Sequence, residues 1–93
     1  MEYASTELEG YRALVTGGTA GIGLACADLL ARAGATVTIT GRDEQRGRDA
    51  AAALGRDVRF ISADLADLTS VRSLAQHFDQ LDILVNNAAA FPG

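Results

Sequence analysis

The chain has 93 residues, 48% of them apolar, which allows one small domain with a real core. Its net charge of −4 argues against nucleic acid and an anionic membrane as partners. One cysteine excludes an internal disulfide framework, and no apolar run approaches the roughly 18 residues of a membrane span. Residues 1–10 lack a secretion signal and are expected to be a polar lead-in to a domain over residues 11–93. A cytoplasmic protein is the default expectation.

The first strand and the first helix flank a glycine-rich segment. Residues 12–16 form a short β-rich run, and a helix is expected from Ile22 to a stop at Gly34. Its apolar stripe, which we expect to face the core, consists of Ile22, Cys26, Leu29, Leu30 and Ala33. Cys26 is accordingly interpreted as a small core residue.

Further strands and helices alternate along the rest of the chain. Residues 36–40 are all β-branched and form the clearest strand. Asp43 is expected to cap a helix over residues 44–54 that stops at Gly55. The remaining elements are a strand over 58–61, a third helix opened by Asp67 or Thr69 and reaching residue 78, and a strand over 83–85.

This βαβαβαβ order predicts an α/β fold with a partial Rossmann-type, doubly wound parallel sheet of four strands and three helices. Right-handed crossovers give an expected strand order of 3-2-1-4, with the glycine-rich turn at the carboxyl end of the central first strand. The strand over 83–85 is then an apolar edge without charges to discourage pairing. We therefore expect marginal stability, with self-association or a partner covering that edge.

The glycine-rich segment reads Thr16-Gly17-Gly18-Thr19-Ala20-Gly21-Ile22-Gly23. A strand, a glycine-rich turn and a helix in this order make a phosphate-binding corner. Glycines let the backbone turn sharply and approach a ligand, and the helix directs its unpaired N–H groups and positive dipole end at the turn. The alternative is a glycine-rich loop that binds nothing.

Four separated motifs, each just after an expected strand, make residues 11–91 resemble the N-terminal part of a short-chain dehydrogenase/reductase. They are the glycine-rich segment, Gly41-Arg42, Asp64-Leu65 and Asn86-Asn87-Ala88. The fourth motif usually ends in glycine, where this chain has Ala89. The resemblance implies a nicotinamide dinucleotide cofactor and oxidoreductase chemistry on a carbonyl or an alcohol.

The resemblance assigns a role to each residue of the glycine-rich segment. Gly17 makes the turn after the strand, Gly21 lets the backbone approach the pyrophosphate, and Gly23 lets the helix lie close to the sheet. The hydroxyl of Thr19 can bond a phosphate oxygen, and the N–H of Ile22 lies at the helix start.

Arg42 bears on the choice of cofactor. Folds that prefer NAD tend to place an acid at the end of the second strand, whereas an arginine nearby suits the 2′-phosphate of NADP. No acid ends this strand, and Asp43 is better interpreted as a helix cap. We therefore favour NADP. NAD stays possible, because a basic residue at position 18 or 20 would also help to bind the phosphate, and this chain has Gly18 and Ala20 there. The alternative is that Arg42 is a solvated loop residue.

The two remaining motifs are assigned by resemblance. Asp64 would accept from the adenine amino group, with the backbone of Leu65 assisting, or would be only a loop or cap residue. Asn87 would contact the ribose region of the cofactor. Asn86 is interpreted as structural, because a buried amide needs partners.

The family's chemistry uses a Ser, a Tyr and a Lys downstream of the Asn-Asn-Ala motif. The chain contains no Lys and no Tyr in that region, so we assign no catalytic residue and expect the chain alone to be inactive. It is either a fragment of a longer enzyme, which would then take a small-molecule substrate, or a naturally short relative. No metal site is assigned, because the only histidine, His77, has no Cys/His cluster near it.

Two further functions compete with the cofactor-binding portion of an NADP(H)-dependent short-chain oxidoreductase. One is a non-catalytic dinucleotide-binding module or degenerate short relative. The other is an interaction protein that uses the exposed strand over residues 83–85.

Overall fold

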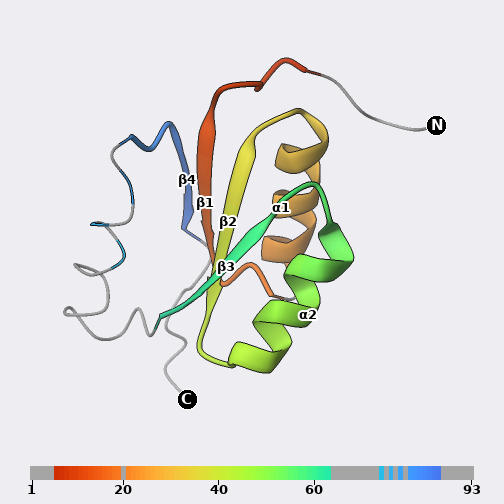
Figure 1. The fold of residues 1–93 in the computed structure, drawn as a ribbon, viewed down its shortest axis with the longest axis vertical. Coiled ribbons are helices and arrows are strands. Elements are labelled where there is room, and N and C mark those ends of the chain that lie inside the picture. The colour runs from red at the N-terminus through yellow and green to blue at the C-terminus, as the bar shows by residue number, and fades with distance from the viewer. Residues whose placement is uncertain are drawn as a thin grey trace.

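The structure is a computed structural model that describes residues 6–19, 21–63, 74, 76, 78 and 80–86. Four parallel strands form one sheet in the order β3-β2-β1-β4 (Figure 1). Their bounds are Arg12–Thr16 for β1, Thr36–Gly41 for β2, Arg59–Ser62 for β3 and Ile83–Asn86 for β4. Helix α1 (Gly21–Arg32) joins β1 to β2, and α2 (Glu44–Leu54) joins β2 to β3. The predicted fold class and strand order are confirmed.

Local signals set most of the element boundaries. Helix α2 begins after Asp43, whose side chain caps it, and ends at Gly55, which has a φ of 65°. Gly34, with a φ of 100°, follows the end of α1. Strand β3 lies one residue later than expected. The third predicted helix lies mainly outside the described residues, although Leu74 within it is helical and buried.

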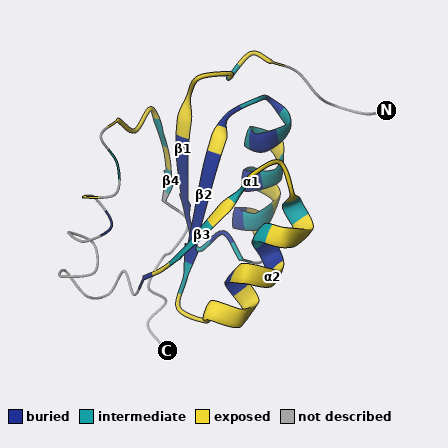
Figure 2. Cartoon of the chain, viewed as in Figure 1, coloured by how far each residue is buried: buried dark blue, intermediate teal, exposed yellow. Residues whose placement is uncertain are grey.

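Both described helices cover the same face of the sheet (Figure 1). Side chains of β1 and β2 that point to this face meet small residues of the helices, and the buried cluster consists of Ala13, Val15, Ala27, Ala31, Ala35, Val37, Ile39 and Ala50. Phe60 of β3 is partly buried and packs against this cluster. The buried core therefore lies along β1 and β2, as the dark strands in Figure 2 show.

The predicted core-facing stripe of α1 is wrong in part: Leu30 packs against the core and Ala33 is buried, but the other three members do not face the core. Ile22 is 75% exposed and Leu29 is 54% exposed, while Cys26 is only half-buried. The buried residues of α1 are Gly23, Ala27 and Ala31. The sheet beneath α1 already carries bulky β-branched side chains, so only small residues let the helix approach it closely. The larger apolar side chains consequently occupy the flanks and the outer surface of the helix.

The opposite face of the sheet carries the alternate residues of the strands. On that face Leu14, Thr16, Thr38 and Thr40 are buried, at 5% exposure or less. Leu84 of β4 is 60% exposed, and β4 pairs only with β1 in the described sheet. The apolar edge predicted for this strand is therefore present in the described part of the chain.

Hydrogen bonds tie the amino ends of the strands together. The Arg12 N–H donates to Oδ2 of Asp82 at 2.8 Å, and the Asp82 N–H donates back to the Arg12 carbonyl at 2.9 Å. The Leu8 N–H donates to the carbonyl of Ala33, and the Leu8 side chain packs against the core. The last residues of the lead-in are thus part of the packed domain. Neither α1 nor α2 is long and apolar enough to cross a membrane.

Candidate functional site

The corner between β1 and α1 has the backbone geometry that its glycines predict. Gly17 follows β1 with a φ of 67°, and Gly21 begins α1 with a φ of 58°. Residues other than glycine rarely adopt such left-handed values. Among the described residues, no atom lies within 4 Å of a Cβ placed on Gly21, so the space around it is open in that part of the chain. Gly23 is buried in the helix. An external group can therefore approach the backbone at Gly21.

Gly18 fastens this corner to the neighbouring strand. Its N–H donates to the carbonyl of Thr40, near the end of β2, at 3.1 Å. A Cβ atom placed on Gly18 would lie 2.7 Å from Cγ2 of Ile39, closer than real side chains come. From the sequence, we assigned Gly18 no role beyond the absence of a basic side chain. The Gly17-Gly18 pair was the available signal, because two adjacent glycines indicate close packing of backbone as well as a turn.

Thr19 and the end of β2 also lie together. A Cβ atom placed on Gly41 would lie 2.9 Å from Cγ2 of Thr19. Arg42 follows β2 directly and is exposed, and no hydrogen bond or ion pair engages its side chain in the described part of the chain. The corner and the Gly41-Arg42 motif, which are separate in sequence, are thus adjacent in space.

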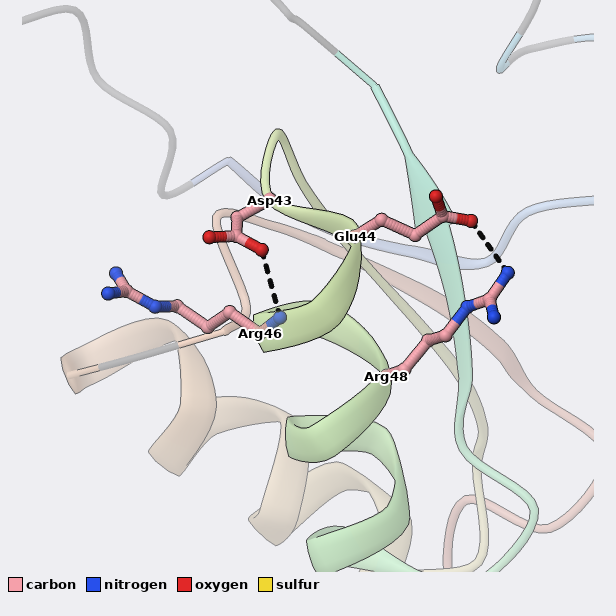
Figure 3. A network of polar contacts seen from close by, with 4 residues as sticks. All are labelled: Asp43, Glu44, Arg46 and Arg48. Atoms are coloured by element: carbon pink, nitrogen blue, oxygen red, sulfur yellow. Dashed lines mark hydrogen bonds and ion pairs between the residues drawn. The ribbon is translucent and has the colours of Figure 1, made fainter.

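The start of α2 is occupied by the chain's own carboxylates (Figure 3). Asp43 accepts a hydrogen bond from the Arg46 N–H at 3.0 Å, and Glu44 in the first turn pairs with Arg48 at 2.6 Å. Asp43 is therefore the helix cap that the sequence predicts. The first turn of α1, by contrast, contains no acidic residue.

Three predicted site residues, Asp64, Leu65 and Asn87, lie outside the described residues. The strands that lead to them end beside the corner. The N–H of Ala63, which precedes Asp64, donates to the carbonyl of Gly41 at 3.0 Å. Asn86 ends β4 in register with Thr16 of β1. The strands that precede all four motifs therefore end at the carboxyl edge of one sheet, where ligands bind in open α/β folds.

Two buried threonine hydroxyls lie near this edge. The hydroxyl of Thr16 donates to the carbonyl of Val85 at 3.3 Å. The hydroxyl of Thr40 is buried and has no hydrogen-bond partner among the residues that the structure describes. Burial without a partner is unfavourable for a hydroxyl, so Thr40 would gain from a polar group brought to this edge.

Other features lie away from the corner. Asp82, at the amino end of β4, has a pKa below its ordinary value of 3.8, because its carboxylate accepts from the Arg12 N–H and from the side chain of Gln80. A hollow of about 510 Å³ lies at the amino ends of β2 and β3, lined by Thr36, Asp57, Val58 and Arg59. Within the described ranges, no group of three or more His, Cys, Asp or Glu residues could hold a metal ion.

Known proteins are similar to this chain in sequence and in fold. Residues 11–92 match the family model for short chain dehydrogenases. A polyprenol dehydrogenase from Mus musculus is 46% identical over 85 residues, which are 82% of this chain and 25% of that protein.

Two solved structures extend the likeness. A short chain dehydrogenase/reductase family protein is 60% identical with a TM-score of 0.89, covering 92% of this chain and 37% of the other. The RhlG/NADP active-site complex from Pseudomonas aeruginosa is 44% identical with a TM-score of 0.85, covering 91% of this chain and 37% of the other. The chain thus spans 25–37% of the length of these relatives. It belongs to the short-chain dehydrogenase family.

Proposed function

We propose that this chain is the cofactor-binding portion of a cytoplasmic, NADP(H)-dependent short-chain oxidoreductase that acts on a carbonyl or an alcohol. One observation carries the proposal: the β1–α1 corner is open at Gly21, lies against the end of β2, and precedes a helix whose first turn has no acidic residue. A dinucleotide's diphosphate supplies the negative charge that such a helix start favours.

Each residue of the corner has a part in this proposal. The positive φ values of Gly17 and Gly21 let the backbone make the turn, and the N–H of Ile22 lies in the first helical turn. The half-buried side chain of Thr19 offers a hydroxyl to a phosphate oxygen. Gly23, buried in the helix, lets α1 lie close to the sheet, so the N-terminus of α1 meets the strand ends.

Arg42 supports NADP over NAD. Its side chain is exposed and unpaired in the described part of the chain, and Gly41 before it supplies no carboxylate for a ribose 2′-hydroxyl. A guanidinium binds a 2′-phosphate through charge-assisted, bidentate hydrogen bonds. A similar solved structure is described as an NADP complex.

We assign the rest of the cofactor to the other two motifs. Asp64 and Leu65 would hold the adenine, and Asn87 the ribose region. No residue of this chain is proposed to move a proton; the nicotinamide supplies hydride chemistry when it is bound. A small-molecule substrate belongs to the proposal only for a longer chain. The second candidate is a dinucleotide-binding module without catalysis.

Calorimetry on the 93-residue chain tests the proposal, with NADPH, NADH and 2′,5′-ADP as ligands. We expect binding of NADPH and 2′,5′-ADP that is tighter than binding of NADH. Arg42→Ala should lower the affinity for NADPH about tenfold and leave the affinity for NADH unchanged, because only the contact with the 2′-phosphate is lost. Arg48→Ala is the matched control, since it removes the same charge from an arginine already paired with Glu44.

The outcomes separate the parts of the proposal. Absence of binding to all three ligands at millimolar concentration would contradict both the oxidoreductase portion and the binding module. If Arg42→Ala lowered the affinities for NADPH and NADH equally, Arg42 would not bind the 2′-phosphate, but the dinucleotide site would stand. Extension of the reading frame without a Tyr-x-x-x-Lys sequence would leave the module as the function.

A further inference from the structure

We propose that Thr19 is a specificity-determining residue of the cofactor site. Its methyl group occupies the space that any side chain at position 41 would need. An aspartate or glutamate therefore does not fit at this position, the end of β2. This inference rests on the proposed function, because position 41 matters only if a ribose lies there. Preference for the phosphorylated cofactor would then come from Arg42, which attracts the phosphate, while Thr19 restricts position 41 to glycine and so leaves no room for a competing acid.

A side chain at position 41 would come closer to Thr19 than real atoms do. A Cβ atom on Gly41 would lie 2.9 Å from Cγ2 of Thr19, 3.5 Å from its Oγ1 and 3.7 Å from Cε1 of Phe60. Only the first of these distances is too short for real atoms, and the others are ordinary van der Waals contacts. Gly41 is not among the glycines with a positive φ. Space, and not backbone conformation, therefore requires glycine at this position.

Neither partner can easily move aside. Thr19 is β-branched, so its methyl group is one bond from Cβ and its rotamers are few. The turn that carries Thr19 is held by the Gly18 N–H, which donates to the carbonyl of Thr40 at 3.1 Å. Gly41 is held from the other side, because its carbonyl accepts from the Ala63 N–H at 3.0 Å. A side chain at position 41 would therefore displace the phosphate-binding turn or break one of these bonds.

This coupling has a consequence for cofactor choice. An acid introduced at position 41 alone would push on the turn that holds the diphosphate, which both NADPH and NADH share. The acid's new bond to a 2′-hydroxyl would come at the expense of the diphosphate contact. Productive use of NADH should therefore require a change at both positions, the acid at 41 and a smaller residue at 19.

The binding experiment compares three variants by NADH and NADPH titration. Gly41→Asp alone should weaken binding of both cofactors. Gly41→Asp combined with Thr19→Ser, which removes Cγ2 and keeps the hydroxyl, should bind NADH about tenfold more tightly than Gly41→Asp alone. Gly41→Asp combined with Thr19→Val keeps a methyl group in place and should show no such gain. If Gly41→Asp alone binds NADH as tightly as its combination with Thr19→Ser, the inference is wrong.

A second measurement needs no nucleotide and uses thermal unfolding. Gly41→Ala adds only the Cβ atom and should lower Tm by about 5 °C or more when residue 19 is threonine or valine. In the Thr19→Ser background the same substitution should leave Tm unchanged or raise it, because alanine restricts the unfolded chain. Folding of Gly41→Ala only with serine at position 19 would support the inference. Equal losses in all three backgrounds, or failure to fold in all, would overturn it.

The two measurements separate the inference from the proposed function. A parent chain that binds no nucleotide would remove the proposed function, and the specificity role of Thr19 with it, even if unfolding still showed the contact. Nucleotide binding without coupling between positions 19 and 41 would instead overturn the inference alone.

Discussion

The two described helices begin in opposite ways. At the start of α2 the chain provides its own anions: Asp43 accepts from the Arg46 N–H, and Glu44 lies in the first turn (Figure 3). At the start of α1 the first turn has no acidic residue, and the backbone around Gly21 is open. The chain's own carboxylates thus supply the negative charge that the N-terminus of α2 favours, whereas the N-terminus of α1 leaves room for an external anion. This contrast is what the proposed diphosphate site at the start of α1 requires.

An acid placed at the start of α1 should produce the largest effect. Ile22→Asp adds a carboxylate to the first turn, at a side chain that is 75% exposed and contributes little to the core. We expect NADPH affinity to fall about tenfold or more by charge repulsion, while stability is unchanged or rises by about 0.5 kcal/mol through the helix dipole. Calorimetry and thermal unfolding measure the two changes.

Leu29→Asp is the matched control for that variant. Leu29 is also exposed on α1 but lies toward its carboxyl-terminal end, where a negative charge opposes the dipole. It should lower Tm slightly and leave NADPH affinity unchanged. A loss of NADPH affinity as large as that of Ile22→Asp would mean that general charge, and not the start of α1, governs binding.

Removal of the cap from α2 should have a smaller effect, and only on stability. Asp43→Ala deletes the carboxylate that accepts from the Arg46 N–H and should cost about 1 kcal/mol of unfolding free energy, or about 5 °C in Tm. Asp43→Asn should retain most of that stability, because asparagine caps nearly as well. If Asp43→Ala weakened NADH binding without loss of stability, Asp43 would be a ribose ligand and the contrast between the helices would fail.

Asp82 provides the smallest and most specific test, since its carboxylate accepts a backbone N–H of β1 and not of α1 or α2. Its pKa lies below 3.8 because of the bond from the Arg12 N–H, so its contribution to stability is present above pH 3.8 and is lost as pH falls through the lowered pKa. Asp82→Ala should therefore be less stable than the parent chain at neutral pH. The difference should shrink under strongly acidic conditions. A difference that does not depend on pH would show that packing of Asp82, and not its charge, ties β4 to β1.

The sequence was sufficient for the strand order and for both ends of α2. Those features depend on local signals: the β-branched run in β2, the cap at Asp43 and the glycine at Gly55. Part of the core-facing side of α1 was predicted wrongly, at Ile22 and Leu29, for a physical reason. Apolar character does not distinguish a side chain that fits beneath a helix from one that is too large, and the sheet selected Ala27 and Ala31 over Ile22 and Leu29.

The contacts that shape the candidate site could not be predicted from local sequence. The turn of Gly18 lies against Thr40, and Thr19 lies against Gly41, only because parallel pairing brings β1 and β2 together. The glycine-rich motif identified the corner itself, because its φ values are a local requirement. It gave no indication that Gly41 is glycine on account of Thr19.

The most direct test of the binding corner is a titration of the 93-residue chain with NADPH, followed through its backbone amide NMR signals. We expect the largest shifts at Gly21, Ile22 and their neighbours in the turn, and small shifts at Arg46 and Gly47 in the first turns of α2. Saturation of the chain with NADPH while the Gly17–Gly23 amides stay unmoved, or no shifts at millimolar NADPH, would contradict the assignment of the diphosphate to this corner.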